Sequence, residues 1–140
     1  LVTEACELFE PVAEQKNIKF SWQADLTVFI RGNAHYLQRM LGNLVENALK
    51  YTPKHGNVNV AIAHERDHIA IAVSDTGIGI AAQDLPRIFE RFFRCDDSRS
   101  EEGCGLGLSF SRAVVRAHGG DIKVTSTPNV GTTFTVHIPN

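Results

Sequence analysis

The stretch LGNLVENALKYTP at residues 41–53 lies in the longest helical pattern of the chain, and the fold class follows from what surrounds it. Over residues 34–51, Leu37, Leu41, Leu44 and Ala48 recur at helical spacing and form one apolar face. The sequence predicts two further helices, one at residues 106–118 and one at residues 2–17, whose apolar face is formed by Val2, Ala5, Phe9, Val12 and Ala13. Alternating apolar residues predict strands at 18–22, 28–30, 58–62, 69–73, 122–124 and 134–138. We therefore expect an α/β fold, a two-layer α/β sandwich with three helices packed on a mostly antiparallel mixed sheet of about five strands.

Composition indicates one ordinary globular domain that covers residues 1–140. The chain is 43% hydrophobic and 21% charged, which is ordinary for a globular protein. Its net charge is −2, so we expect no nucleic-acid partner. No apolar run reaches the length of a membrane span, and we expect no direct membrane contact. The three cysteines are odd in number and lack CxxC spacing, which favours a reducing, cytoplasmic setting over a disulfide framework or a zinc site. The chain starts directly in a helical pattern, so we expect a domain of a longer protein.

One face of the central helix carries the first set of polar side chains. At about 100° per residue, Asn43, Asn47, Lys50 and Tyr51 fall on the same side. An amide oxygen can join a magnesium shell, and a lysine ammonium can neutralise phosphate. The simpler interpretation is a solvated helix face, and this helix taken alone favours that interpretation. Glu46 points about 100° away from Asn47 and is expected to be solvated.

The stretch DTGIGI at residues 75–80 follows a predicted strand. A carboxylate at a strand end can accept a hydrogen bond from an amino group, and Gly77 and Gly79 let the backbone turn sharply towards a flat ligand. Ile80 adds apolar surface. Asp and Gly are also common in plain turns, which is the alternative.

Two more stretches complete the pattern. RIFERFFR at 87–94 places Phe89, Phe92 and Phe93 among arginines, and we expect the aromatics to anchor one end of a segment whose other end is polar. GCGLGLS at 103–109 places Gly103, Gly105 and Gly107 at the start of the last long helix. Free backbone amides at a helix N-terminus bind phosphate oxygens, although a glycine triplet alone is a weak signal.

These four stretches, in this order, resemble the catalytic and ATP-binding domain of bacterial sensor histidine kinases. That domain belongs to the Bergerat-type superfamily shared with gyrase B, Hsp90 and MutL. The resemblance implies ATP and Mg²⁺ as cofactors, Asn47 as the magnesium ligand and Asp75 as the residue that recognises adenine. It implies a lid at about residues 81–105 and a nucleotide-contacting set of Tyr51, Gly77, Gly79, Ile80, Gly103, Gly105, Leu106, Gly107 and Leu108. It also implies that Lys50 approaches the phosphates and that Arg94 reaches phosphate or a neighbouring domain.

Two departures bear on the reaction. Asn43 stands where gyrase-like relatives have an acidic residue that activates water, and an amide cannot serve as that base. None of the six histidines lies in a context that resembles a phosphoacceptor motif. The resemblance therefore implies transfer of the γ-phosphoryl group to a histidine on a separate dimerisation domain of the same parent protein, and then to a response regulator.

The same resemblance implies a monomeric cytoplasmic domain of a bacterial inner-membrane sensor. A gyrase-type ATPase and a non-catalytic nucleotide-sensing or docking domain remain the alternatives. Asn33 departs from an acidic residue of the family and is expected to cap the helix that follows it.

Overall fold

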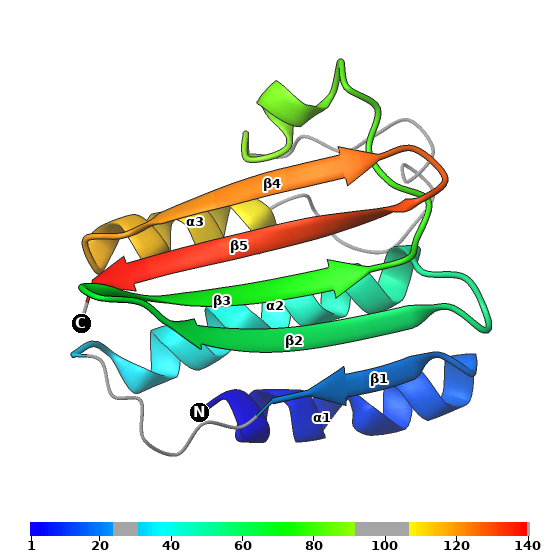
Figure 1. Cartoon of the computed structure of the whole chain (residues 1–140), viewed down its shortest axis with the longest axis horizontal. Helices are drawn as coiled ribbons and strands as arrows, with labels where there is room; N and C mark the ends of the chain where they lie inside the picture. The colour runs from blue at the N-terminus through cyan, green and yellow to red at the C-terminus, as the bar shows by residue number, and fades with distance from the viewer. Residues whose placement is uncertain (24–30, 92–106, 140) are drawn as a thin grey trace.

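In the computed structural model, which describes residues 1–23, 31–91 and 107–139, three helices cover one face of a five-stranded sheet (Figure 1). The helices are α1 (Val2–Lys16), α2 (Ala34–Tyr51) and α3 (Gly107–Ala117), with a short 3-10 helix η1 (Leu85–Arg87). The strands are β1 (Lys19–Trp22), β2 (Asn57–His64), β3 (His68–Asp75), β4 (Asp121–Thr127) and β5 (Gly131–Pro139). The predicted α/β sandwich is confirmed, while the strand predicted at 28–30 lies outside the described residues.

The sheet has the order β1-β2-β3-β5-β4, and only β1 and β2 run parallel. The antiparallel pairs β2–β3 and β4–β5 are joined by short turns, whereas α2 lies between β1 and β2 in the chain and makes their parallel pairing possible. Strand alternation points one set of side chains at the helices and the other set at the opposite face. That opposite face, hereafter the open face, carries His68, Ala70 and His137 and is covered by no described helix (Figure 1).

The core lies between α2 and the sheet. Leu41, Leu44 and Val45 of α2 are fully buried against the strands, as the apolar spacing predicts. In α1, Ala5 and Ala13 are buried, but Val12 is 40% exposed, so the prediction that it faces the core is wrong. Val12 lies about 100° around the helix from Ala13, and the contact face of this peripheral helix is too narrow to include both. No helix in the described ranges is both long and apolar enough to span a bilayer.

The segment after β3 is anchored by aromatic contacts. Ile88 is buried, and the Phe89 ring meets that of Phe134 edge-on at 6.2 Å. The Arg112 guanidinium lies 5.1 Å from the centre of the Phe89 ring. Phe89 therefore anchors this end of the segment as predicted, whereas Phe92 and Phe93 fall outside the described residues.

Candidate functional site

Asp75 ends β3, between Val58 of β2 and Thr132 of β5. Its Oδ1 accepts a hydrogen bond from the Gly77 amide at 2.8 Å. Burial raises the pKa of the Asp75 carboxyl, and hydrogen bonds from the Gly77 and Thr132 backbones oppose that shift. The sheet thus holds a partly desolvated acceptor at one end of β3, suited to a ligand that donates a hydrogen bond.

The turn after Asp75 packs against the C-terminus of α2. The Ile78 amide donates to the Tyr51 carbonyl at 3.1 Å. A Cβ atom at Gly77 would lie 2.5 Å from that same oxygen, closer than real Cβ contacts allow. Glycine at 77 is therefore needed for this close approach, which joins the carboxylate to the polar face of α2.

The second half of the turn is held by the β4–β5 hairpin. Gly79 has φ of 73°, and a Cβ atom there would meet the Thr127 carbonyl. The Ile80 amide donates to Ser126 Oγ at 2.7 Å, and the Ile80 side chain packs partly against the core. Both predicted glycines and Ile80 are thus positioned by contacts that the sequence does not reveal.

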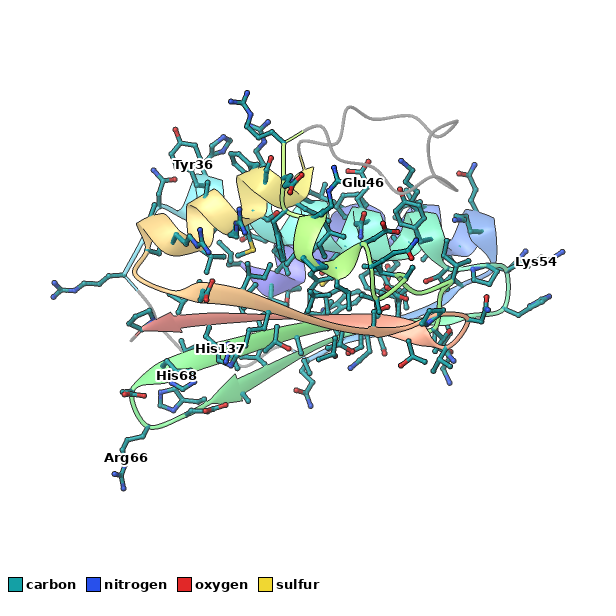
Figure 2. All side chains as sticks on the ribbon, turned by 90° about the horizontal axis from the view of Figure 1, so that it is seen from above. Tyr36, Glu46, Lys54, Arg66, His68 and His137 are labelled. Carbon is teal, nitrogen blue, oxygen red and sulfur yellow. The ribbon has the colours of Figure 1, made fainter. Side chains whose placement is uncertain are left out.

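Asn43 and Asn47 of α2 are both half-buried. Neither amide side chain has a hydrogen-bond partner within the described part of the chain, so both can receive a ligand. Glu46 is exposed, as expected, and Figure 2 shows it on the helical side of the sheet. One turn after Asn47, the Lys50 ammonium lies 5.5 Å from the centre of the Tyr51 ring.

The start of α3 lies beside Asn43. A Cβ atom at Gly107 would be 3.9 Å from Asn43 Cβ and Cγ, an ordinary contact distance. Leu108 follows and packs partly against the core. Arg94, Gly103, Gly105 and Leu106 lie outside the described residues. Among the described ones, contacts run from Gly107 to Asn43, along two turns of α2 to Tyr51, and on to Gly77 and Asp75.

Two supporting residues were missed by the sequence analysis. Thr132 hydrogen-bonds Asp75 and Ser126 holds Ile80, yet both look like ordinary residues of alternating strands.

The expected cap of α2 is confirmed, since Asn33 Oδ1 accepts a hydrogen bond from the Tyr36 amide at 3.0 Å. His118 comes directly after α3, and its Nε2 accepts a hydrogen bond from the Asn33 amide at 3.0 Å, a bond that links two distant elements.

Comparison with known proteins gives matches over most of the chain. Residues 32–140 match the family model described as histidine kinase-, DNA gyrase B-, and HSP90-like ATPase. The sensor-like histidine kinase SenX3 of Mycobacterium tuberculosis is 39% identical over 141 residues, covering 99% of this chain and 34% of that protein. The sensor histidine kinase WalK of Bacillus subtilis is 37% identical over 119 residues, covering 82% of this chain and 20% of that protein. The chain thus spans about a third or less of these relatives.

Solved structures agree over the whole fold. The nucleotide-free catalytic domain of the histidine kinase ThkA superposes with a TM-score of 0.86 at 27% identity, covering 99% of this chain and 90% of that one. Full-length ShkA in complex with AMPPNP superposes with a TM-score of 0.87 at 29% identity, and the match covers 99% of this chain and 29% of that one.

Proposed function

This chain belongs to the histidine kinase-, DNA gyrase B- and HSP90-like ATPase family as a histidine kinase catalytic domain, and from that membership we propose that it binds MgATP and donates the γ-phosphoryl group to a histidine on a separate dimerisation domain. The observation that carries the proposal is the continuous line of contacts from Asp75 through the polar face of α2 to Gly107. It supports a site in which the base binds near Asp75 and the phosphates bind near the N-terminus of α3.

The base would bind at Asp75. Its carboxylate can accept a hydrogen bond from the exocyclic amino group of adenine, and such bonds to a charged acceptor are stronger than neutral ones. The Gly77–Gly79 turn keeps side chains away from the flat face of the base, Ile80 supplies apolar contact, and Tyr51 lies along the nucleotide.

The phosphates would lie towards α3. Gly107 and Leu108 begin α3, where free backbone amides and the helix dipole favour negative charge. We propose that the amides of Gly103, Gly105 and Leu106, which come just before them in the sequence, supply further donors. Lys50 and Arg94 add positive charge. Asn47 would hold Mg²⁺, and its half-exposed amide without a described partner fits that role. When bound, the ion supplies neutralisation of phosphate charge.

Delivery of the phosphoryl group, rather than hydrolysis, is supported by Asn43. This amide faces the start of α3, where a carboxylate could activate water, but it has no basic oxygen near neutral pH. The domain therefore contributes positioning and charge neutralisation, which are the main requirements of phosphoryl transfer. The acceptor histidine would come from the parent protein, a bacterial membrane sensor with this domain in the cytoplasm, and a response regulator would receive the group next.

Calorimetric titration with AMPPNP, in magnesium and in chelator, tests the binding step. We expect Asp75→Asn to weaken binding at least about ten-fold, because a hydrogen bond to a charged group is worth about 1.5–3 kcal/mol. Asn47→Ala should remove the gain that magnesium gives. Glu46→Gln is the matched control, because Glu46 is exposed and directly precedes Asn47, and this variant should bind AMPPNP as tightly as the unsubstituted chain. Absence of binding by well-folded protein would instead indicate a docking domain that has lost its nucleotide.

A further inference from the structure

A second cluster of ligand-type side chains lies on the open face of the sheet, where β3 begins. Glu65 belongs to the β2–β3 turn, His68 starts β3, and His137 lies on β5 opposite Ala70. One ligand atom from each of the three residues lies within 4.8 Å of the other two. Figure 2 shows His68 and His137 together on the side of the sheet away from the helices, while Arg66 points outward.

His137 supplies an unsatisfied nitrogen. Its Nδ1 is buried and has no hydrogen-bond partner, and it is the only such side-chain atom within the described residues. A buried polar atom without a partner costs roughly 1–3 kcal/mol, and native proteins rarely leave one unexplained. A bound cation would satisfy this nitrogen.

His68 is oriented by carboxylates on both sides. Its Nδ1 lies 2.9 Å from Asp67 Oδ1, and its Nε2 lies 3.0 Å from Glu65 Oε2. A proton on Nδ1 that is donated to Asp67 leaves the Nε2 lone pair directed at Glu65. This is the carboxylate–histidine arrangement that fixes the tautomer and orientation of histidine ligands in metal sites.

The spacing also suits one ion. With bonds of about 2.0–2.2 Å, tetrahedral ligands of zinc lie about 3.4 Å from each other. The observed 3.0 Å between His68 and Glu65 and the limit of 4.8 Å for the set need only small side-chain adjustments. Two imidazoles and one carboxylate favour zinc and similar transition metals over Mg²⁺ or Ca²⁺, which take oxygen ligands.

We propose that Glu65, His68 and His137 form a binding site for a divalent transition-metal ion, with zinc as the best fit, and that Asp67 positions His68 within it. Bound metal connects the β2–β3 turn to β5 and stabilises the folded state over the unfolded one. The site is separate from the proposed nucleotide site, because His68 and Asp75 occupy opposite ends of β3, about 23 Å apart along the strand.

The test is a zinc titration by calorimetry, with Co²⁺ absorption as a second readout. A Cys95→Ser/Cys104→Ser background removes two thiols as competing ligands. The third, Cys6, is fully buried, and burial raises its thiol pKa to about 11. We expect one ion per chain, with visible Co²⁺ bands of tetrahedral type.

Substitutions test whether Glu65, His68 and His137 are the residues that bind the zinc. Glu65→Gln, His68→Gln and His137→Gln should each weaken binding at least ten-fold and abolish the rise in melting temperature that zinc gives. Asp67→Asn should weaken it about ten-fold, as loss of an orienting carboxylate typically does. His35→Gln is the control, because this exposed histidine lies on α2 away from the site. Glu65 and His68 are at least partly exposed, so their variants should fold even if His137→Gln does not.

The absence of stoichiometric zinc binding would overturn the proposal. Equal zinc affinity in the unsubstituted chain and in Glu65→Gln or His68→Gln would also overturn it. So would a loss of zinc affinity in His35→Gln as large as the loss in those two variants. Either of the last two results would mean scattered binding to surface histidines.

Discussion

At the scale of single residues, Asp75 shows a conflict between stability and binding. Burial raises the pKa of its carboxyl, which means that the folded chain holds the ionised form less favourably than the unfolded chain does. The same partial desolvation strengthens a hydrogen bond to a ligand. A charge that is costly in the free protein is therefore retained where a nucleotide would use it.

Asp75→Asn should consequently raise the free energy of unfolding at pH 7 while it weakens nucleotide binding. The substituted amide keeps an oxygen for the Gly77 amide and carries no charge to desolvate. The direction of the change in stability follows from proton linkage, because the Asp75 carboxyl of the wild type takes up a proton at a higher pH in the folded state than in the unfolded state. The stability gained by Asp75→Asn therefore shrinks as pH falls through the raised pKa. It should vanish below about 3.8, the ordinary value.

Urea unfolding at pH 7 and at a series of acidic values measures this difference. Asp121→Asn is the control, because Asp121 lies at the start of β4 with its side chain 58% exposed. A variant less stable than the parent at pH 7 would show that Asp75 is needed for the fold and would contradict the argument.

The positions of Asp75, Gly77 and Asn47 at a strand end, in a turn and on a polar helix face could be predicted, because short stretches of sequence set that local geometry. Their roles in nucleotide binding stay predictions. Thr132, Ser126 and His137 could not be found in this way. Their roles depend on which strands pair and in which register, and the partners of β5 are up to about seventy residues away in the chain.

At the scale of elements, α2 serves both the core and the site, so its C-terminal end has to be fixed. Lys16 of α1 does this, because its Nζ donates to the Leu49 carbonyl at 2.5 Å and to the Lys50 carbonyl at 3.2 Å. These carbonyls belong to the last turn of α2, where the helix dipole favours a positive charge.

Lys16→Met should lower the free energy of unfolding by about 1–2 kcal/mol, because it removes a charged donor but keeps most of the apolar stem. Lys19→Met on β1 is the control, since Lys19 is exposed and its change should stay within about 0.5 kcal/mol. Equal stability of the two variants in urea unfolding would show that the Lys16 contact contributes nothing to the anchoring of α2.

Prediction of helices and strands from sequence depended on periodicity. It failed for features that depend on how the elements pack against one another. The strong pattern of residues 34–51 gives α2 with the bounds observed, and the antiparallel hairpins follow from short turns between alternating segments. The parallel pairing of β1 with β2 has no local signal, because it depends on how α2 crosses the sheet. Val12 was misplaced for a similar reason, since a peripheral helix buries a narrower face than its apolar residues indicate.

At the scale of the whole molecule, the chain carries a complete set of candidate nucleotide contacts but no acceptor in a recognisable context. We therefore expect the chain alone to incorporate no phosphate from labelled ATP and to release phosphate at a rate near zero. Addition of a dimerisation domain from a related sensor kinase, with its acceptor histidine intact, should give phosphate incorporation that is lost on acid treatment. The acceptor is then the partner's imidazole, and this chain contributes the donor site.

Two variants make the outcome specific. Asn47→Ala in this chain and a histidine-to-glutamine change in the partner should each abolish incorporation, whereas Glu46→Gln should not. Rapid ATP turnover by the chain alone, removed by Asp75→Asn, would contradict the proposal and indicate a gyrase-type ATPase despite Asn43. The Asn43 argument would fail with it, because some other group would have to activate water beside the start of α3.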